Sequence, residues 1–151
     1  MENYQPSIRA ASWSAAQCVR HFCRTRGISH PDIEAFCQHL ENVVTADSIV
    51  TWDAQGERLR VTGLGDPLPN ALKSVPGLNE LLNAAREVTA TQMYAAWTPL
   101  NVVKYLAETA ECSGLSPDAV LAKAAMLHSP DKQGWGAAIS STERNKWSRE
   151  A

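Results

Sequence analysis

Three stretches with one chemical form decide the fold of this chain: Ser29-His30-Pro31-Asp32, Thr98-Pro99 and Ser116-Pro117-Asp118. A Ser or Thr hydroxyl accepts a hydrogen bond from an N–H group that has no partner inside the first turn of a helix. Proline suits the first helical position because its missing N–H would be unpaired there. An acid in the first turn interacts favourably with the helix dipole. The three stretches therefore predict three helix starts in a helix-rich domain.

Apolar residues recur at helical spacing on either side of these starts. The spacing predicts helices over residues 12–26, 31–45, 99–113 and 117–127. A further helix begins at Leu78 and either runs on through Trp97 or breaks near Thr89 and Thr91. Gly27 is placed to end the first helix, since glycine readily adopts the left-handed conformation found at helix ends. Because the connector after Gly27 is short, we expect the first two helices to form an antiparallel hairpin.

One segment has the chemistry of a β-hairpin rather than of a helix. Residues 48–52 are β-branched and aromatic, and residues 58–62 alternate polar and apolar side chains. Between them, Asp53 and Gly56 are typical turn residues, because aspartate bonds its own backbone and glycine tolerates a positive φ. We therefore expect a mainly α fold, a compact domain of about five to six helices with one small β-hairpin at about 48–62.

Length and composition point to a single domain. At 151 residues the chain can bury a hydrophobic core without disulfides or a metal. We expect residues 1–130 to form this domain and residues 131–151 to form a C-terminal tail, either packed on it or partly flexible. The first residues lack the features of a secretory signal, and no apolar run is long enough to span a membrane. A cytoplasmic location with reduced cysteines is the resulting expectation.

The charge balance weighs against a general nucleic-acid binder. The net charge is −2 and the pI is near 6.1, whereas such proteins usually present a concentrated basic face. One segment nevertheless resembles a helix-turn-helix motif, with Ala110, Gly114 and Val120 at the motif's spacing. Its second helix would present Asp118, Ala119, Ala122 and Lys123. This set is poor for reading base edges, because only Lys123 is cationic, and two helices joined by a tight turn is the simpler interpretation.

A cluster of cysteines and histidines near the N-terminus either binds a metal or belongs to the core. Its members are Cys18, His21, Cys23, His30, Cys37 and His39. None of the spacings is the C-x2-C pattern typical of a zinc site. Three of the cysteines lie on or beside the apolar faces predicted for the first two helices, which comprise Ala15, Ala16, Val19, Phe22 and Cys23, and Ile33, Phe36, Cys37, Leu40 and Val44. We therefore predict buried, metal-free thiols at Cys18, Cys23 and Cys37, with His21 and His39 on the other faces.

No catalytic motif is present at usable strength. The chain contains no G-x-S-x-G sequence, and no histidine forms a recognisable motif with Cys112 or a serine. Asp53, Glu57 and Asp66 cluster in and after the expected hairpin, either as an acid pair or cation site or as turn residues. The turn role suits Asp53, which opens the turn, and Asp66, which precedes Pro67. We therefore predict no catalytic residue, no metal and no cofactor.

An exposed aromatic surface is the remaining candidate site. Glu87, Tyr94 and Trp97 lie on neighbouring turns of one predicted helix, and aromatic side chains are enriched in binding hot spots. The alternative is that Trp97 and Met93 complete the core. Further tryptophans, expected to be partly exposed, are Trp13, Trp135 and Trp147.

Three features of the sequence are similar to those of a known class of proteins. They are the Trp52-Asp53 turn, the loop Gly63-Leu64-Gly65-Asp66-Pro67-Leu68-Pro69 and the helix through Glu87 and Tyr94. In these features, and in its size, mild charge and lack of catalytic motifs, the chain resembles the bacterial immunity proteins that neutralise polymorphic toxins. The resemblance implies stoichiometric binding that covers a toxin's active site or locks its conformation, and it assigns no role to a single residue. The net charge of −2 differs from the strongly acidic immunity proteins that face basic nucleases.

The sequence thus predicts a non-catalytic protein-binding domain, most concretely an immunity protein that neutralises a cognate bacterial toxin. The expected partner is a protein such as that toxin, with no membrane and no nucleic acid. A DNA-associated regulator that uses residues 110–128 is the alternative, and a small enzyme with an unrecognised site is the third hypothesis. The candidate partner-binding residues are Asp53, Glu57, Asp66, Glu87, Tyr94 and Trp97.

Overall fold

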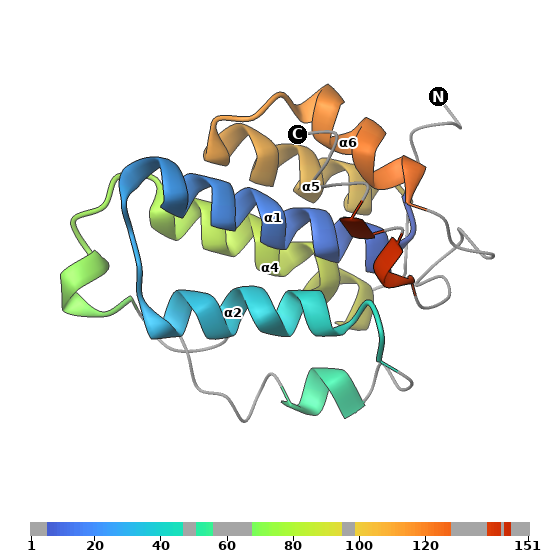
Figure 1. The fold of residues 1–151 in the computed structure, drawn as a ribbon, viewed down its shortest axis with the longest axis horizontal. Helices are drawn as coiled ribbons and strands as arrows, with labels where there is room; N and C mark the ends of the chain where they lie inside the picture. Colours follow the sequence, from blue (N-terminus) through green and yellow to red (C-terminus); the bar gives the residue numbers. More distant parts are fainter. Residues whose placement is uncertain are drawn as a thin grey trace.

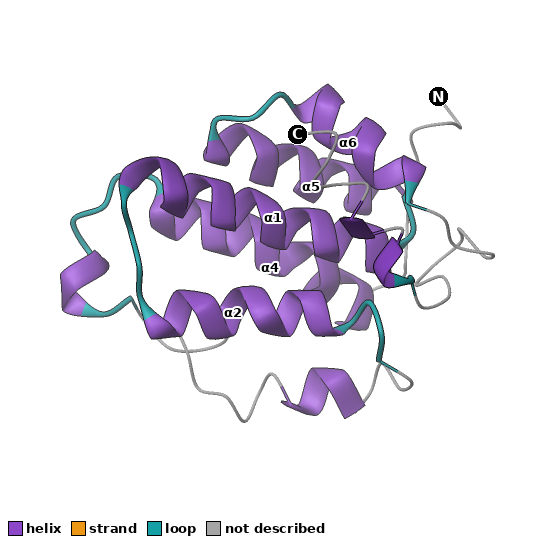
Figure 2. Cartoon of the chain, viewed as in Figure 1, coloured by secondary structure: helices purple, strands orange, loops and turns teal. Residues whose placement is uncertain are grey.

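The computed structural model describes residues 6–46, 51–55, 68–94, 99–127, 139–142 and 144–145, with side chains at 90–94 and 99–100 left aside. The main elements are α1 (Ile8–Arg26), α2 (Pro31–Asn42), the short 3-10 helix η2 (Asn70–Leu72), α4 (Leu78–Tyr94), α5 (Pro99–Ser113) and α6 (Pro117–Met126). Figure 2 shows helices joined by loops, and no β-strand occurs among the described residues. The prediction of a mainly α, compact domain is confirmed.

The central helix of the fold is α1. It packs against α2, α4, α5 and α6, and Figure 1 shows it in front of α4 and alongside α2. Alanine, serine and cysteine occupy most of its buried positions, and such small side chains let neighbouring helices approach closely. The larger side chains of Ile8, Val19 and Phe22 fill the remaining space and are almost completely buried. The small buried residues of α1 therefore explain why four other helices can pack against it.

The start of α1 lies earlier than predicted, whereas its end agrees with the sequence. The hydroxyl oxygen of Ser7 accepts a hydrogen bond from the Ala10 N–H at 3.2 Å, so the helix begins at Ile8 rather than at residue 12. The apolar pattern missed this turn because it contains Arg9, a polar residue that is nevertheless buried. Ser12 is also buried, and its hydroxyl donates to the Leu40 carbonyl at 2.7 Å. Gly27 ends the helix with a φ of 67°, as expected.

The second helix, α2, runs antiparallel to α1, as predicted (Figure 1). Its first position is Pro31, but the cap is the His30 ring, whose Nδ1 accepts a hydrogen bond from the Asp32 N–H at 3.1 Å. Assigning this cap to the Ser29 hydroxyl was therefore wrong. At the other end, the guanidinium of the buried Arg9 donates to the carbonyls of Val43 and Ala46. These bonds satisfy carbonyls that have no partner within the helix, which ends at Asn42 rather than at residue 45.

The β-hairpin prediction is wrong for the part of the segment that the structure describes. Residues 51–55 are helical, and Figure 1 shows this short helix beside α2. The indole N–H of Trp52 donates to the His39 carbonyl at 2.6 Å, and the Trp52 side chain is almost fully buried. Burial of one large aromatic against α2 outweighs the β-propensity of its neighbours. The rest of the expected hairpin, residues 48–50 and 56–62, lies outside the described residues.

The helices in the second half follow their sequence signals. Continuing unbroken to Tyr94, α4 accommodates Thr89, whose hydroxyl donates to the Arg86 carbonyl at 3.3 Å. α5 begins at Pro99 as predicted, while Thr98 lies outside the described residues. α6 begins at Pro117, and the Ser116 hydroxyl oxygen accepts a hydrogen bond from the Ala119 N–H at 3.3 Å. The predicted tight turn between α5 and α6 is confirmed, with Gly114 at a φ of 84°.

Residues from the C-terminal part of the chain also reach the core. The Ile139 side chain is 1 % exposed and packs in a cluster with Ala10, Val44 and Leu127. Its N–H donates to the Val44 carbonyl at 3.1 Å. Among the described residues, no helix has the length and hydropathy that a membrane crossing requires.

Candidate functional site

A shallow groove lies between α4 and α5. These two helices pack together, and α1 packs against both of them. The groove has a volume of about 390 Å³, and its lining consists of Glu80, Asn83, Ala84, Glu87, Tyr105, Glu108, Glu111 and Cys112. Ala84, Tyr105 and Cys112 supply an apolar floor, and four glutamates supply the polar rim. We call this feature the acidic groove.

Helical spacing explains why the acids of the groove lie together. Glu80 and Glu87 are seven residues apart on α4, which is about two helical turns, so they share a face. Glu108 and Glu111 are three residues apart on α5 and are likewise neighbours. Packing of α4 against α5 then brings the two acidic faces to one groove.

Four carboxylates line the groove, and one ammonium group, that of Lys104, lies 5.1 Å from the ring centroid of the lining residue Tyr105. Glu80, Glu108 and Glu111 are exposed, and within the described part of the chain none of the three forms an ion pair. Burial raises the pKa of the Cys112 thiol, and neighbouring carboxylates raise it further. These carboxylates belong to Glu108, Glu111 and Glu80. A raised pKa makes this thiol a weak nucleophile at neutral pH.

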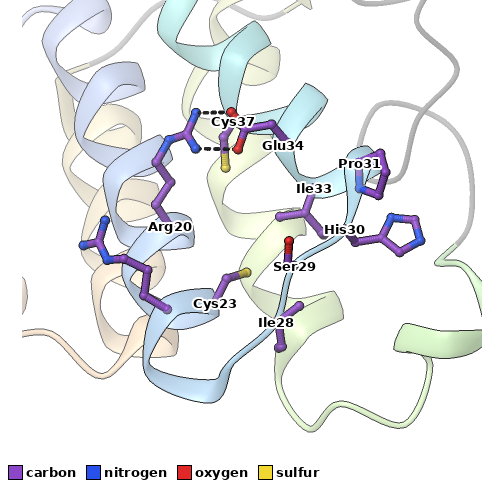
Figure 3. Close-up of a pocket in the computed structure, with 10 residues that line it drawn as sticks. Arg20, Cys23, Ile28, Ser29, His30, Pro31, Ile33, Glu34 and Cys37 are labelled. Carbon is purple, nitrogen blue, oxygen red and sulfur yellow. Dashed lines mark hydrogen bonds and ion pairs between the residues drawn. The ribbon is translucent and has the colours of Figure 1, made fainter.

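A second hollow, of about 380 Å³, lies between α1 and α2 and is shown in Figure 3. Two of the charged groups that line it, Arg20 and Glu34, are paired with each other. The guanidinium of Arg20 on α1 binds both oxygens of Glu34, at 2.7 and 3.1 Å, and both oxygens of Glu41, at 2.9 and 2.8 Å. The hydrogen bonds that Arg20 donates to Glu41 and then to Glu34 raise the pKa of Arg20, and the bonds to Glu34 lower the pKa of that carboxyl group. Arg20 therefore joins the two helices and is not available to a ligand.

The thiols near the N-terminus are part of the core. Cys18, Cys23 and Cys37 are buried, as predicted. Burial raises the pKa of Cys18 and of Cys37 to about 12, and it also raises the pKa of Cys23. Thiolate is the form that attacks substrates and binds metals, so these groups are poorly suited to either role. Among the described residues, no group of three or more potential ligands is arranged to hold a metal ion.

One histidine of this cluster does not lie where the sequence predicted. His39 was expected on the outer face of its helix, but it is 5 % exposed and its ring stacks on Trp52 with 4.4 Å between ring centroids. The periodicity of α2 could not reveal this, because the side chain that covers His39 comes from a separate helical segment.

Of the candidate partner-binding residues, Glu87 lies in the acidic groove. Asp53 lies in the helical segment 51–55 and is half-buried rather than being part of a hairpin turn. Tyr94 is the last residue of α4 and its side chain is not among those described. Glu57, Asp66 and Trp97 lie outside the described residues, so the aromatic surface of the sequence analysis stays a prediction.

Three acids of the groove were missed by the sequence analysis. Glu80 precedes Glu87 by about two turns, and this spacing predicts that the two acids share one face of the helix. Glu108 and Glu111 also had helical spacing, but their approach to α4 depends on how α4 and α5 pack. The acidic groove is therefore a feature that the sequence contained only in part.

The segment that resembles a helix-turn-helix motif has a surface of mixed character. On α6, Asp118, Ala119 and Met126 are exposed, whereas Lys123 is half-buried. This arrangement of one acid, one small residue and one apolar residue offers little to a phosphate backbone or to base edges. Of the four residues that this motif would present, Asp118 and Ala119 are exposed, and Ala122 and Lys123 are half-buried.

Comparison with known proteins leaves the geometry as the only guide to function. No family model matches the chain, and neither a curated protein nor a solved structure matches it. The fold and the acidic groove thus define a helical domain with an acidic surface feature.

Proposed function

We propose that this protein is a non-catalytic binding domain whose partner is a protein with a basic surface. The most concrete form of the proposal is an immunity protein that neutralises a cognate bacterial toxin by direct binding. The observation that carries the proposal is the acidic groove, whose lining combines apolar surface with the exposed carboxylates of Glu80, Glu108 and Glu111.

The two components of the groove have different physical roles in binding. An apolar floor supplies affinity, because removing apolar surface from water is favourable by about 25 cal/mol per Å². Carboxylates at the rim attract a basic partner and orient it, which mainly raises the association rate at low salt. Together they favour a charge-selective protein contact.

The proposal can be tested by co-expressing this chain with toxin-like proteins encoded beside it. A true partner should form a stable complex, and its toxicity should be neutralised. Glu108→Lys should slow association by at least about tenfold at low salt, because it reverses a charge on the groove. Asp118→Lys makes the same change of charge on the exposed part of α6 and is the matched control.

Two results would contradict the proposal. One is that no encoded neighbour binds and that the purified protein instead turns over a small molecule. The other is a specific DNA site recovered by selection, which would favour the regulator hypothesis for residues 110–128.

A further inference from the structure

We infer that the acidic groove receives an amphipathic helix of the partner, with lysine or arginine along its flanks and a large apolar side chain at its centre. This inference rests on the proposed function and specifies the structure of the segment that binds. Three observations carry it: the helical walls of the groove, the spacing of its acids and the small residues of its floor.

The helical walls decide which form of peptide can dock. Both walls, α4 and α5, are continuous helices, so their backbone N–H and C=O groups in the middle of the groove are already paired within each helix. An extended peptide gains affinity by pairing its backbone with an open sheet edge, and the groove offers none. A polyproline segment needs an aromatic-lined groove, whereas Tyr105 is the single aromatic residue of this lining. A helix, whose own backbone is paired, needs neither a sheet edge nor an aromatic-lined groove.

The spacing of the acids matches the repeat of a helix. Glu80 and Glu87 lie about 10 Å apart along the axis of α4, given a rise of 1.5 Å per residue. Glu108 and Glu111 lie about one turn apart on the opposite wall. A bound helix of roughly three turns, with cations on both flanks at intervals of one or two turns, would place a positive charge near each acid.

The floor provides room for an apolar anchor. Ala84 is a small, buried residue between Glu80 and Glu87, and Cys112 is a small residue on the facing helix. The half-buried Tyr105 of α5 also lines the groove, with the Lys104 ammonium 5.1 Å from its ring centroid. A leucine, methionine or phenylalanine of the partner would cover this floor. Such central apolar contacts usually dominate the binding energy of a helix in a groove.

Cys112 gives a direct readout of occupancy. It lines the groove and is half-buried, whereas Cys18, Cys23 and Cys37 are buried in the core. The probe is a synthetic amphipathic peptide of leucine and lysine, and the control peptide replaces every lysine with glutamate. The reaction is run at alkaline pH, where a thiol with a raised pKa is also alkylated. At a peptide concentration ten times its Kd, alkylation of Cys112 by iodoacetamide should slow about tenfold. The glutamate peptide should give no protection.

Matched variants locate the bound peptide. Glu108→Lys should abolish most of the protection, while Asp118→Lys should keep it, because both make the same change of charge but only Glu108 lines the groove. Equal effects of the two substitutions would overturn the inference, since they would show attraction to net charge alone. Binding of the lysine peptide without protection of Cys112 would also overturn it.

The same readout separates this inference from the proposed function. A natural partner that binds stably while leaving Cys112 unprotected overturns the helix-in-groove inference and leaves the binding function standing. Sedimentation that shows a dimer dissociated by Glu108→Lys would overturn the inference in favour of a second copy of this chain. Failure to find any natural partner would instead remove the proposed function.

Discussion

His39 and Trp52 connect two segments of the chain through a single pair of side chains. Their rings stack with a 1° angle between planes, and the Trp52 indole N–H also donates to the His39 carbonyl. Burial lowers the pKa of His39 from 6.5 to about 4, because the ring is removed from the water that would stabilise its charge. The folded protein therefore holds His39 in its neutral form at neutral pH.

This pKa predicts a defined acid sensitivity. Between about pH 6.5 and pH 4, the unfolded chain binds a proton at His39 that the folded protein does not bind. The contribution of His39 is therefore fully present above pH 6.5 and is lost as the pH falls toward 4. At about 1.4 kcal/mol per pKa unit, the loss in the free energy of unfolding is up to about 3 kcal/mol.

The measurement is urea unfolding across this pH range. His39→Gln removes the titrating group and should flatten the dependence of stability on pH, whatever its effect on stability itself. Gln38→Ala changes an exposed neighbour on α2 without removing a titratable group and is the control. The same pH dependence in the wild type and in His39→Gln would contradict the interpretation.

At the scale of the element, α2 and α6 differ in which residue before the proline caps the first turn. Ser116 caps α6 through its hydroxyl, whereas the ring of His30 rather than Ser29 caps α2. Both starts have proline at the first position and an acid in the first turn. The general form of a helix start is thus readable from the sequence, while the choice between two adjacent cap residues depends on the local backbone.

These caps lead to a paired prediction on stability. Ser116→Ala should lower the free energy of unfolding by about 1 kcal/mol, because the Ala119 N–H loses its partner. Ser29→Ala should change it by less than about 0.5 kcal/mol, because Ser29 is exposed and outside the cap. Chemical denaturation of the two variants tests both values. An equal loss from both substitutions would show that Ser29 takes part in the start of α2.

On the scale of the whole molecule, residue Ile139 connects the C-terminal part of the chain to the core. It packs beside Ala10 of α1 and Val44 after α2, and its N–H binds the Val44 carbonyl. The sequence prediction placed this residue in the tail 131–151, for which packing and flexibility were both open. For Ile139 itself, the structure shows packing.

Removing this contact should destabilise the whole domain. Ile139→Ala should lower the free energy of unfolding by about 2–4 kcal/mol, since it leaves a cavity next to fully buried side chains. Ser141→Ala, at an exposed position nearby, should change it by less than about 0.5 kcal/mol. Thermal unfolding followed by circular dichroism measures both. A small effect of Ile139→Ala would mean that the C-terminal contact contributes little to stability.

The candidate site was predictable only where it depends on one helix. Glu87 was identified from its spacing on a single helix, and Glu80 could have been identified in the same way. Glu108 lies 28 residues beyond Glu80 in the sequence, so no local pattern relates the two. Their common groove arises from the packing of α4 against α5, which buries apolar faces and leaves the acids at the surface.

The sequence by itself determined the features that act within a few residues. It determined the starts of α5 and α6 at proline, the end of α1 at Gly27 and the buried thiols of the first two helices. These features follow from hydrogen bonds and side-chain periodicity inside one element. The residues that take part are close together in the sequence, so a local pattern predicts them.

Tertiary structure alone decided the features that need two distant segments. It made residues 51–55 helical, because Trp52 is buried against α2 in spite of the β-propensity around it. It placed His39 in the core, because the Trp52 ring covers it from thirteen residues away. It also assembled the acidic groove, because burial of apolar surface is non-directional and selects the packing of whole helices rather than the place of each charge.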